Sequence, residues 1–144
     1  DILIGSVKLY TYLNNGNGTF TRDTRNETLI NNFIFEIELA DIDGDGDNDM
    51  AIYYSNTNSN IDWFENDSTG QFTFGGSITT TADDVNSMRF ADFDNDGLPD
   101  FVTAYGQTGK LVWMHNQGSG VFSAENVLKT YNILLRSRCS RCRF

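Results

Sequence analysis

The chain has 144 residues, of which 39% are hydrophobic and 13% aromatic, and a formal net charge of −10. This length is enough for one domain with a hydrophobic core, and because no run of about 18 apolar residues is present, we expect no membrane-spanning helix. The acidic balance argues against nucleic acid as a partner, since binding it requires Lys and Arg to neutralise phosphates. Cations are the expected partners instead.

Short apolar segments separated by Asn, Gly, Asp and Ser turns follow one another along the chain. The first three are residues 1–5 (DILIG), residues 9–14 (LYTYLN) and the segment beginning at Phe20. They recur as residues 49–53, 61–66 and the segment at Phe72, and again as residues 100–105, 111–116 and the segment at Phe122. Their length and their content of Ile, Val, Phe, Tyr and Trp predict β-strands, four to a repeat of about 50 residues. No segment has the periodicity of a helix.

The predicted strands carry apolar residues on both faces. In residues 61–66, Ile61 and Trp63 lie on one face and Phe64 on the other, so this strand must be covered on both sides. Four-stranded sheets stacked around an axis, as in a β-propeller, meet this requirement, whereas the rungs of a parallel solenoid are much shorter than 50 residues. Because propellers need 4 to 8 blades, we predict an all-β propeller fragment of two to three four-stranded antiparallel blades.

The repeat divides the chain into four parts. These are residues 1–40, a partial first blade and the start of the next; residues 41–91 and 92–128, two repeat units that each open with an acidic loop; and residues 129–144, a basic tail. In this frame Asp1 is the counterpart of Asp49, the last residue of an acidic loop. The tail contains Cys139 and Cys142, but a zinc site needs four ligands and no second pair is present. We therefore interpret the tail as a segment outside the repeat pattern. One hypothesis is that it is translated out of frame.

Two nine-residue acidic loops, residues 41–49 and 92–100, carry the strongest chemical signal. Asp occupies positions 1, 3, 5 and 9 of each loop, with Gly at position 6. Carboxylates on alternating residues of a flexible segment suit Ca²⁺, which takes six to eight oxygen ligands. The predicted ligands are the side chains of Asp41, Asp43, Asp45 and Asp49 with the carbonyl of Asp47, and the side chains of Asp92, Asp94, Asp96 and Asp100 with the carbonyl of Leu98. The sequence therefore predicts two calcium sites.

An EF-hand, a metal-free turn and a site for a different metal fit these loops less well. An EF-hand needs a Glu at position 12, where this chain has Ile52 and Thr103 within predicted strands. A solvated turn without metal would leave the carboxylates to repel one another, by on the order of 1 kcal/mol for each pair at about 4 Å in water. Magnesium demands a more rigid octahedral geometry, and the loops contain no His or Cys for a softer metal.

The acidic loops and the segments after them, Asp-Met-Ala-Ile and Asp-Phe-Val-Thr, and further on Trp-Phe-Glu-Asn and Trp-Met-His-Asn, resemble the FG-GAP or VCBS-type repeats. These repeats occur in the propellers of integrin alpha subunits, in fungal propeller lectins and in many secreted bacterial proteins. The resemblance covers residues 1 to about 128 and implies that each acidic loop joins the first two strands of a blade and binds Ca²⁺. The Phe-Gly and Gly-Ala-Pro signatures of the integrin version are missing, so the chain is more similar to the bacterial type.

Three aromatic positions have alternative interpretations. Trp63 and Trp113 are equivalent in the repeat and could stack on sugar rings, but packing between blades is favoured because both have apolar neighbours. His115, the one histidine of the chain, has Leu13 and Glu65 as repeat equivalents and is interpreted as an incidental strand residue.

These features predict a calcium-binding propeller module of a secreted or cell-surface protein, acting as a binding or adhesion scaffold. Its expected partners are an extracellular protein or carbohydrate, and further blades in the same chain or in an oligomer. No catalytic constellation is found, so we do not expect this fragment to be an enzyme. The alternative is a propeller that accompanies, or shapes the active site of, a secreted polysaccharide-acting enzyme.

Overall fold

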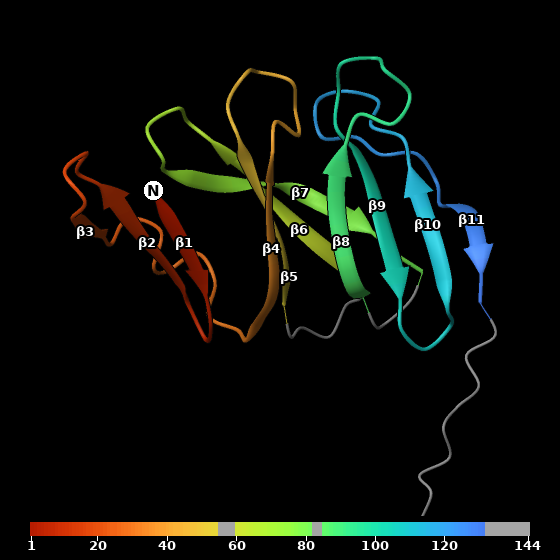
Figure 1. Ribbon diagram of the computed structural model, residues 1–144, viewed down its shortest axis with the longest axis horizontal. Helices are drawn as coiled ribbons and strands as arrows, with labels where there is room; N and C mark the ends of the chain where they lie inside the picture. The colour runs from red at the N-terminus through yellow and green to blue at the C-terminus, as the bar shows by residue number, and fades with distance from the viewer. Residues whose placement is uncertain (55–59, 82–84, 132–144) are drawn as a thin grey trace, which may run out of the picture.

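The computed structural model describes residues 1–54, 60–81 and 85–131, which form β-strands and no helix (Figure 1). The strands make three antiparallel sheets, each with its strands in a simple up-and-down order. The first sheet contains β1 (Ile2–Gly5), β2 (Leu9–Asn14) and β3 (Phe20–Asp23). The second contains β4 (Ile34–Ala40), β5 (Asp49–Tyr54), β6 (Asn60–Asn66) and β7 (Phe72–Thr79), and the third β8 (Val85–Ala91), β9 (Asp100–Tyr105), β10 (Lys110–Met114) and β11 (Asn126–Thr130). Nothing in these described parts is a helix able to span a membrane.

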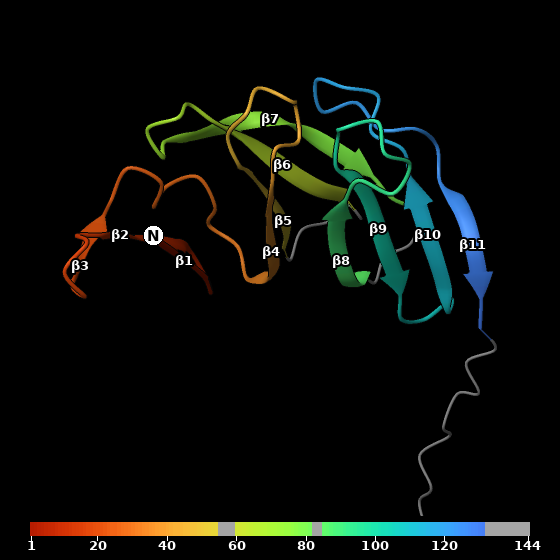
Figure 2. The ribbon, with the colours of Figure 1, turned by 45° about the horizontal axis from the view of Figure 1, so that its top comes forward.

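The three sheets stand side by side in an open arc and do not close into a ring (Figures 1 and 2). The first strand of the second sheet, β4, contacts both β1 and β8. Arg89 of β8 forms ion pairs with Glu36 and Glu38 of β4, which tie the second and third sheets together. This arrangement confirms the predicted all-β fold and makes the chain a fragment of a β-propeller.

The repeat predicted from the sequence is visible in one recurring hydrogen bond. The amides of Asn14, Asn66 and Asn116 donate to Oδ1 of Asp1, Asp49 and Asp100, over 2.8, 3.0 and 2.9 Å respectively. The strands β1, β5 and β9 therefore correspond to one another, and the first sheet has no counterpart of β4 and β8 among the described residues.

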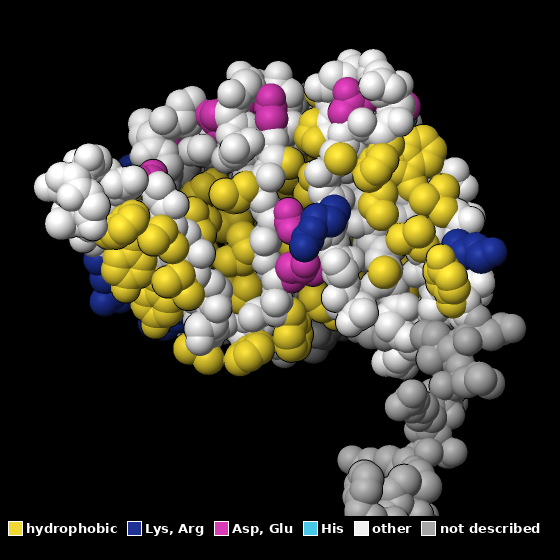
Figure 3. All heavy atoms as spheres, viewed as in Figure 1, with side chains coloured by type: hydrophobic (Ala, Val, Ile, Leu, Met, Phe, Trp, Pro, Cys, Tyr) yellow, Lys and Arg dark blue, Asp and Glu magenta, His cyan; other side chains and the backbone are white. Residues whose placement is uncertain are grey.

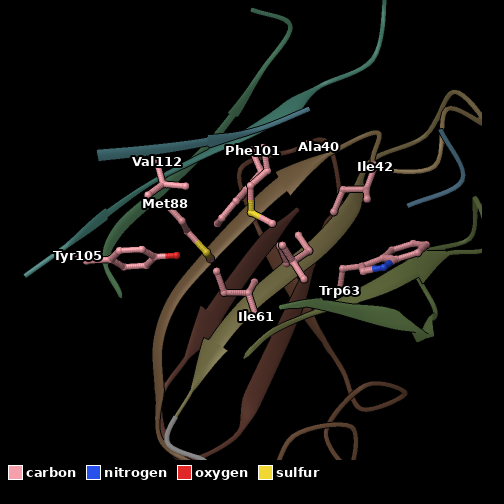
Figure 4. Packing of buried hydrophobic residues seen from close by; sticks show 11 residues of the cluster. Ala40, Ile42, Ile61, Trp63, Met88, Phe101, Tyr105 and Val112 are labelled. Carbon is pink, nitrogen blue, oxygen red and sulfur yellow. The ribbon is translucent and has the colours of Figure 1, made fainter. Parts of the chain in front are cut away.

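The second sheet is covered on both faces, as its sequence pattern predicted. Met50, Ile52 and Phe64 belong to a core cluster shared with Leu9 of the first sheet. The other face contributes to a second cluster, between the second and third sheets, whose members are Ala40, Ile42, Ala51, Ile61, Trp63, Ile78, Met88, Phe101, Tyr105, Val112 and Met114. Figure 4 shows Met88 of the third sheet pointing toward Ile61 of the second. Alternate residues of β5 and β6 thus stabilise two different interfaces.

Trp63 is buried between sheets, whereas Trp113 is half-buried and outside the core cluster. The indole of Trp63 packs directly against the backbone of glycine residues. A Cβ added to Gly75 would come 2.6 Å from it, and one added to Gly120, in the connection between β10 and β11, would come 2.2 Å from it. The prediction of core packing is confirmed for Trp63.

We expect Gly120→Ala to lower the free energy of unfolding by about 2–4 kcal/mol, since the methyl group would displace Trp63 and the backbone φ of 68° is unfavourable for alanine. Urea denaturation measures the effect. Gly18→Ala is the matched control, because Gly18 has a φ of 82° but no atom within 4 Å of the added Cβ. If the two variants lost equal stability, contact with Trp63 would have no part in the effect.

Candidate metal-binding loops

The two acidic loops join the first and second strands of the second and third sheets, as residues 41–48 between β4 and β5 and residues 92–99 between β8 and β9. Both lie at the same end of the sheets, where Figure 3 shows acidic side chains in magenta (Figures 1 and 3). The first loop is anchored by Ile42, whose side chain is fully buried in the core between the sheets.

Each loop brings three carboxylates together. One oxygen each from Asp41, Asp43 and Asp45 lies within 4.8 Å of the other two, and the same holds for Asp92, Asp94 and Asp96. These are positions 1, 3 and 5 of the predicted ligand sets.

The same hydrogen bond curls both loops. The amide of Gly46 donates to Asp41 Oδ2, and that of Gly97 donates to Asp92 Oδ2, both over 3.1 Å. These glycines have φ values of 101° and 95°, a conformation that explains why position 6 is glycine in both loops.

The aspartate at position 9 holds backbone amides in both loops. Asp49 and Asp100 are completely buried. Oδ2 of Asp49 accepts hydrogen bonds from the amides of Ile42 (2.8 Å) and Asp43 (3.3 Å), and Oδ2 of Asp100 accepts one from the amide of Phe93 (3.2 Å). Together with their bonds to Asn66 and Asn116, these contacts make Asp49 and Asp100 clamps that tie the loop to the sheet. Asp49 is not in the group formed by Asp41, Asp43 and Asp45.

The two clamps differ in their ionisation. Burial raises the pKa of Asp49 to about 6, and the nearby Asp43 carboxylate adds to this effect. Burial also opposes ionisation of Asp100, but hydrogen bonds to the carboxylate, first among them the one from the amide of Asn116, outweigh it, so that its pKa lies below the usual value. The pKa of Asp43 is raised, first by burial and then by the surrounding carboxylates.

Position 7 is occupied differently in the two loops. Asp47 accepts a hydrogen bond from Ser68 Oγ over 2.5 Å through its Oδ2, while its Oδ1 is buried and has no hydrogen-bond partner among the described residues. Leu98 donates its amide to Asp96 Oδ1, and its side chain lies beside Gly44 of the first loop. The carbonyl ligands predicted at Asp47 and Leu98 stay predictions.

Two residues that follow β10 were not predicted to belong to the site. His115 Nδ1 lies 3.0 Å from Asp94 Oδ2 and 3.2 Å from Asp100 Oδ1. Asn116 is completely buried, and its Nδ2 donates to the carbonyls of Ile42 (2.9 Å) and Pro99 (3.1 Å), so it links the two acidic loops. The recurrence of Asn at positions 14, 66 and 116 is a sequence signal that could have identified Asn116.

The family described as FG-GAP-like repeat matches the chain three times, over residues 1–52, 41–103 and 92–135. The chain belongs to this family. Successive FG-GAP-like matches overlap on the acidic loops, so these loops are the junctions of the repeat. No curated protein matches the chain.

The donor set of these FG-GAP-like repeats fits a hard divalent cation. All ligand candidates within the two groups of three are carboxylate oxygens, which Ca²⁺ prefers. The buried Asp47 Oδ1 without a hydrogen-bond donor is an acceptor that a cation would satisfy.

If a cation binds in the first loop, it should release about half a proton at pH 6 and close to one proton at about pH 5. Since the pKa of Asp49 is about 6, this group is largely protonated below that pH, and a nearby cation favours its ionised form. Calcium affinity of the first loop is therefore expected to fall by up to about tenfold per pH unit below 6. In the calcium-free protein the stability has the opposite pH dependence. Because burial raises the folded pKa of Asp49, the contribution of Asp49 to stability falls as pH rises from about 4 to 6.

Calorimetry at pH 6 in two buffers of different ionisation enthalpy measures this proton release. A variant with Asp92, Asp94 and Asp96 replaced by Asn isolates the first loop. A binding enthalpy that is independent of the buffer would contradict the prediction.

Proposed function

We propose that the chain is a calcium-binding β-propeller module of a secreted or cell-surface protein and that it acts as a scaffold for protein or glycan ligands. The observation that supports this most is the convergence of three carboxylates at the same positions of both loops. Millimolar extracellular calcium suits weak sites with a Kd of about 10⁻⁴ to 10⁻³ M. In this proposal the described residues act by binding and not by catalysis.

Calcium would stabilise the contact between blades as well as each loop. The carbonyl of Asp43 accepts a hydrogen bond from the amide of Ser119 over 3.3 Å, and Ile42 is tied to Asn116. Ser119 and Asn116 lie in the connection that follows β10 of the third sheet, whereas Asp43 belongs to the loop of the second sheet. An ion that orders the first loop would therefore also order the interface between the two sheets.

Further blades, in the same chain or in an oligomer, are part of this proposal. Phe93 occupies the position in the second loop that Ile42 occupies in the first. Ile42 is covered by the third sheet, but the side chain of Phe93 is 54% exposed. An additional blade stacked on the third sheet would cover Phe93 in the way the third sheet covers Ile42.

A pocket lies between the second and third sheets. It has a volume of about 570 Å³ and is lined by Trp63 and Phe122, with Ser77, Thr81 and Glu125 as polar groups. Apolar walls with a few polar groups are typical of ligand sites. We propose this pocket as the place where a glycan or a protein side chain would bind, which a glycan array probed with the intact protein would test.

Thermal melting tests the calcium proposal. With Ca²⁺ present at about 1–10 times its Kd, stabilisation by mass action is about 0.4–1.4 kcal/mol per site, so the melting temperature should rise with calcium and fall with chelator. A variant with Asp41, Asp43 and Asp45 replaced by Asn should lose part of this shift. A melting temperature that calcium does not move would contradict the proposal.

A further inference from the structure

The second loop contains a ligand type that the first loop does not. His115 directly follows β10, and its side chain is 33% exposed. Its Nδ1 lies 3.0 Å from Asp94 Oδ2 and 3.2 Å from Asp100 Oδ1, and its Nε2 lies 4.0 Å from Asp96 Oδ2. A ring nitrogen from one strand end therefore converges on carboxylates from the loop and from β9.

The three groups Asp94, Asp100 and His115 have the spacing of ligands around one ion. Their ligand atoms all lie within 4.8 Å of one another. Two ligands placed about 2.0–2.1 Å from a tetrahedral Zn²⁺ are about 3.3 Å apart, close to the two distances made by Nδ1. Asp100 is held in place by the amides of Asn116 and Phe93, so this carboxylate is oriented in advance.

The equivalent place in the second sheet is occupied by Glu65. Glu65 lines a pocket of about 500 Å³ together with Asp43 and Asp45 of the first loop. The residue at this repeat position is thus near the acidic loop in both sheets, but only in the second loop is it a nitrogen ligand. Imidazole favours borderline metals such as Zn²⁺, whereas an all-carboxylate set favours Ca²⁺.

Asp94 belongs to both ligand groups of the second loop, the one with Asp92 and Asp96 and the one with Asp100 and His115. Two cations could not use this carboxylate independently. Binding in one position would therefore weaken binding in the other.

We propose that Asp94, Asp100 and His115 form a site for a borderline divalent cation of the Zn²⁺ class, and that this cation competes at Asp94 with the calcium ion proposed for the second loop. The inference rests on the proposed function, because it assumes that the second loop is a metal site. Three protein ligands leave at least one coordination position open to water or to a ligand. The first loop, with oxygen donors alone, is not affected by this competition.

His115 is itself the reporter for the test, because it is the one histidine of the chain. The protein is prepared without a histidine tag and with Cys139→Ser and Cys142→Ser, which removes the two thiols as zinc ligands. Zn²⁺ is then titrated while the imidazole C–H resonances of His115 are followed by NMR. We expect both resonances to shift and saturate at one Zn²⁺ per chain, and calcium to reduce the apparent zinc affinity.

Two variants separate a metal ligand from a simple ion pair. His115→Ala should lower zinc affinity at least tenfold in calorimetry. His115→Glu, which copies the residue found in the second sheet, should also lower zinc affinity, because it removes the nitrogen ligand. Calcium binding to the first loop should be unchanged in both variants. If His115 did not shift with Zn²⁺, or if His115→Ala bound zinc as tightly as the parent, the inference would be overturned while calcium binding still stood. If calcium failed to bind either loop, the proposed function would fail whatever zinc did.

Discussion

Asp100→Ala is expected to lower the free energy of unfolding by about 3–5 kcal/mol in calcium-free buffer at pH 7. The carboxylate is completely buried and accepts hydrogen bonds from the amides of Phe93 and Asn116. Without it, these two amides lose their charged partner, and the loop is no longer tied to the end of β10. The lowered pKa of Asp100 likewise means that its ionised form stabilises the fold. This contribution to the free energy of unfolding is present above the unfolded pKa and is lost as pH falls through the folded pKa.

Urea denaturation of the calcium-free protein measures this effect independently of metal binding. Asp96→Ala is the matched control, since Asp96 is an exposed residue of the same loop that accepts a hydrogen bond from the amide of Leu98. We expect it to lower the free energy of unfolding by about 1 kcal/mol or less. Equal losses in the two variants would mean that the position-9 aspartate is not a structural clamp.

Asn116→Ala should lower the free energy of unfolding by about 3–4 kcal/mol. The side chain is fully buried, and its Nδ2 donates to the carbonyls of Ile42 and Pro99 while its Oδ1 accepts from the amide of Gly118. Alanine would leave all three groups without this partner and would open a cavity between the two acidic loops. We also expect calcium to bind the first loop more weakly in this variant, because Ile42 would lose its tie to the third sheet.

The control for Asn116 comes from the same chain. Asn14 occupies the equivalent repeat position, but it is exposed and its Oδ1 accepts a hydrogen bond from the amide of Gly16 over 2.9 Å. Asn14→Ala should therefore lower the free energy of unfolding by about 1 kcal/mol or less. Denaturation curves of the two variants that coincide would contradict a linking role for Asn116.

The strands and the acidic loops could be predicted because they depend on local pattern. Apolar residues on both faces of residues 61–66 required two covering sheets, and the second sheet has them. The alternating aspartates required a curled loop, and positions 1, 3 and 5 converge as expected. Such features follow from residue type and spacing alone.

The different roles of the aspartates within each loop could not be predicted from the sequence. A carboxylate in the cluster at positions 1, 3 and 5 and one that accepts hydrogen bonds from backbone amides have the same residue type, so the sequence pattern groups Asp49 and Asp100 with the other aspartates. Burial at the start of β5 and β9 is what makes them clamps. His115 has Leu13 and Glu65 as repeat equivalents and so gives no repeating signal, and its place in the site depends on how the end of β10 meets the second loop.

The tail expected over residues 129–144 begins within β11, which ends at Thr130. Cys139 and Cys142 lie outside the described residues. The hypothesis that this segment is translated out of frame is tested by its nucleotide sequence, in which another frame should encode a further acidic loop.

Calorimetric titration with Ca²⁺ is the most direct test of the claim that the acidic loops are metal sites. We predict two ions per chain, one of which is lost when Asp41, Asp43 and Asp45 are replaced by Asn and the other when Asp92, Asp94 and Asp96 are replaced. Retention of both ions in the folded triple variants, or the absence of calcium binding to the folded parent protein, would contradict it.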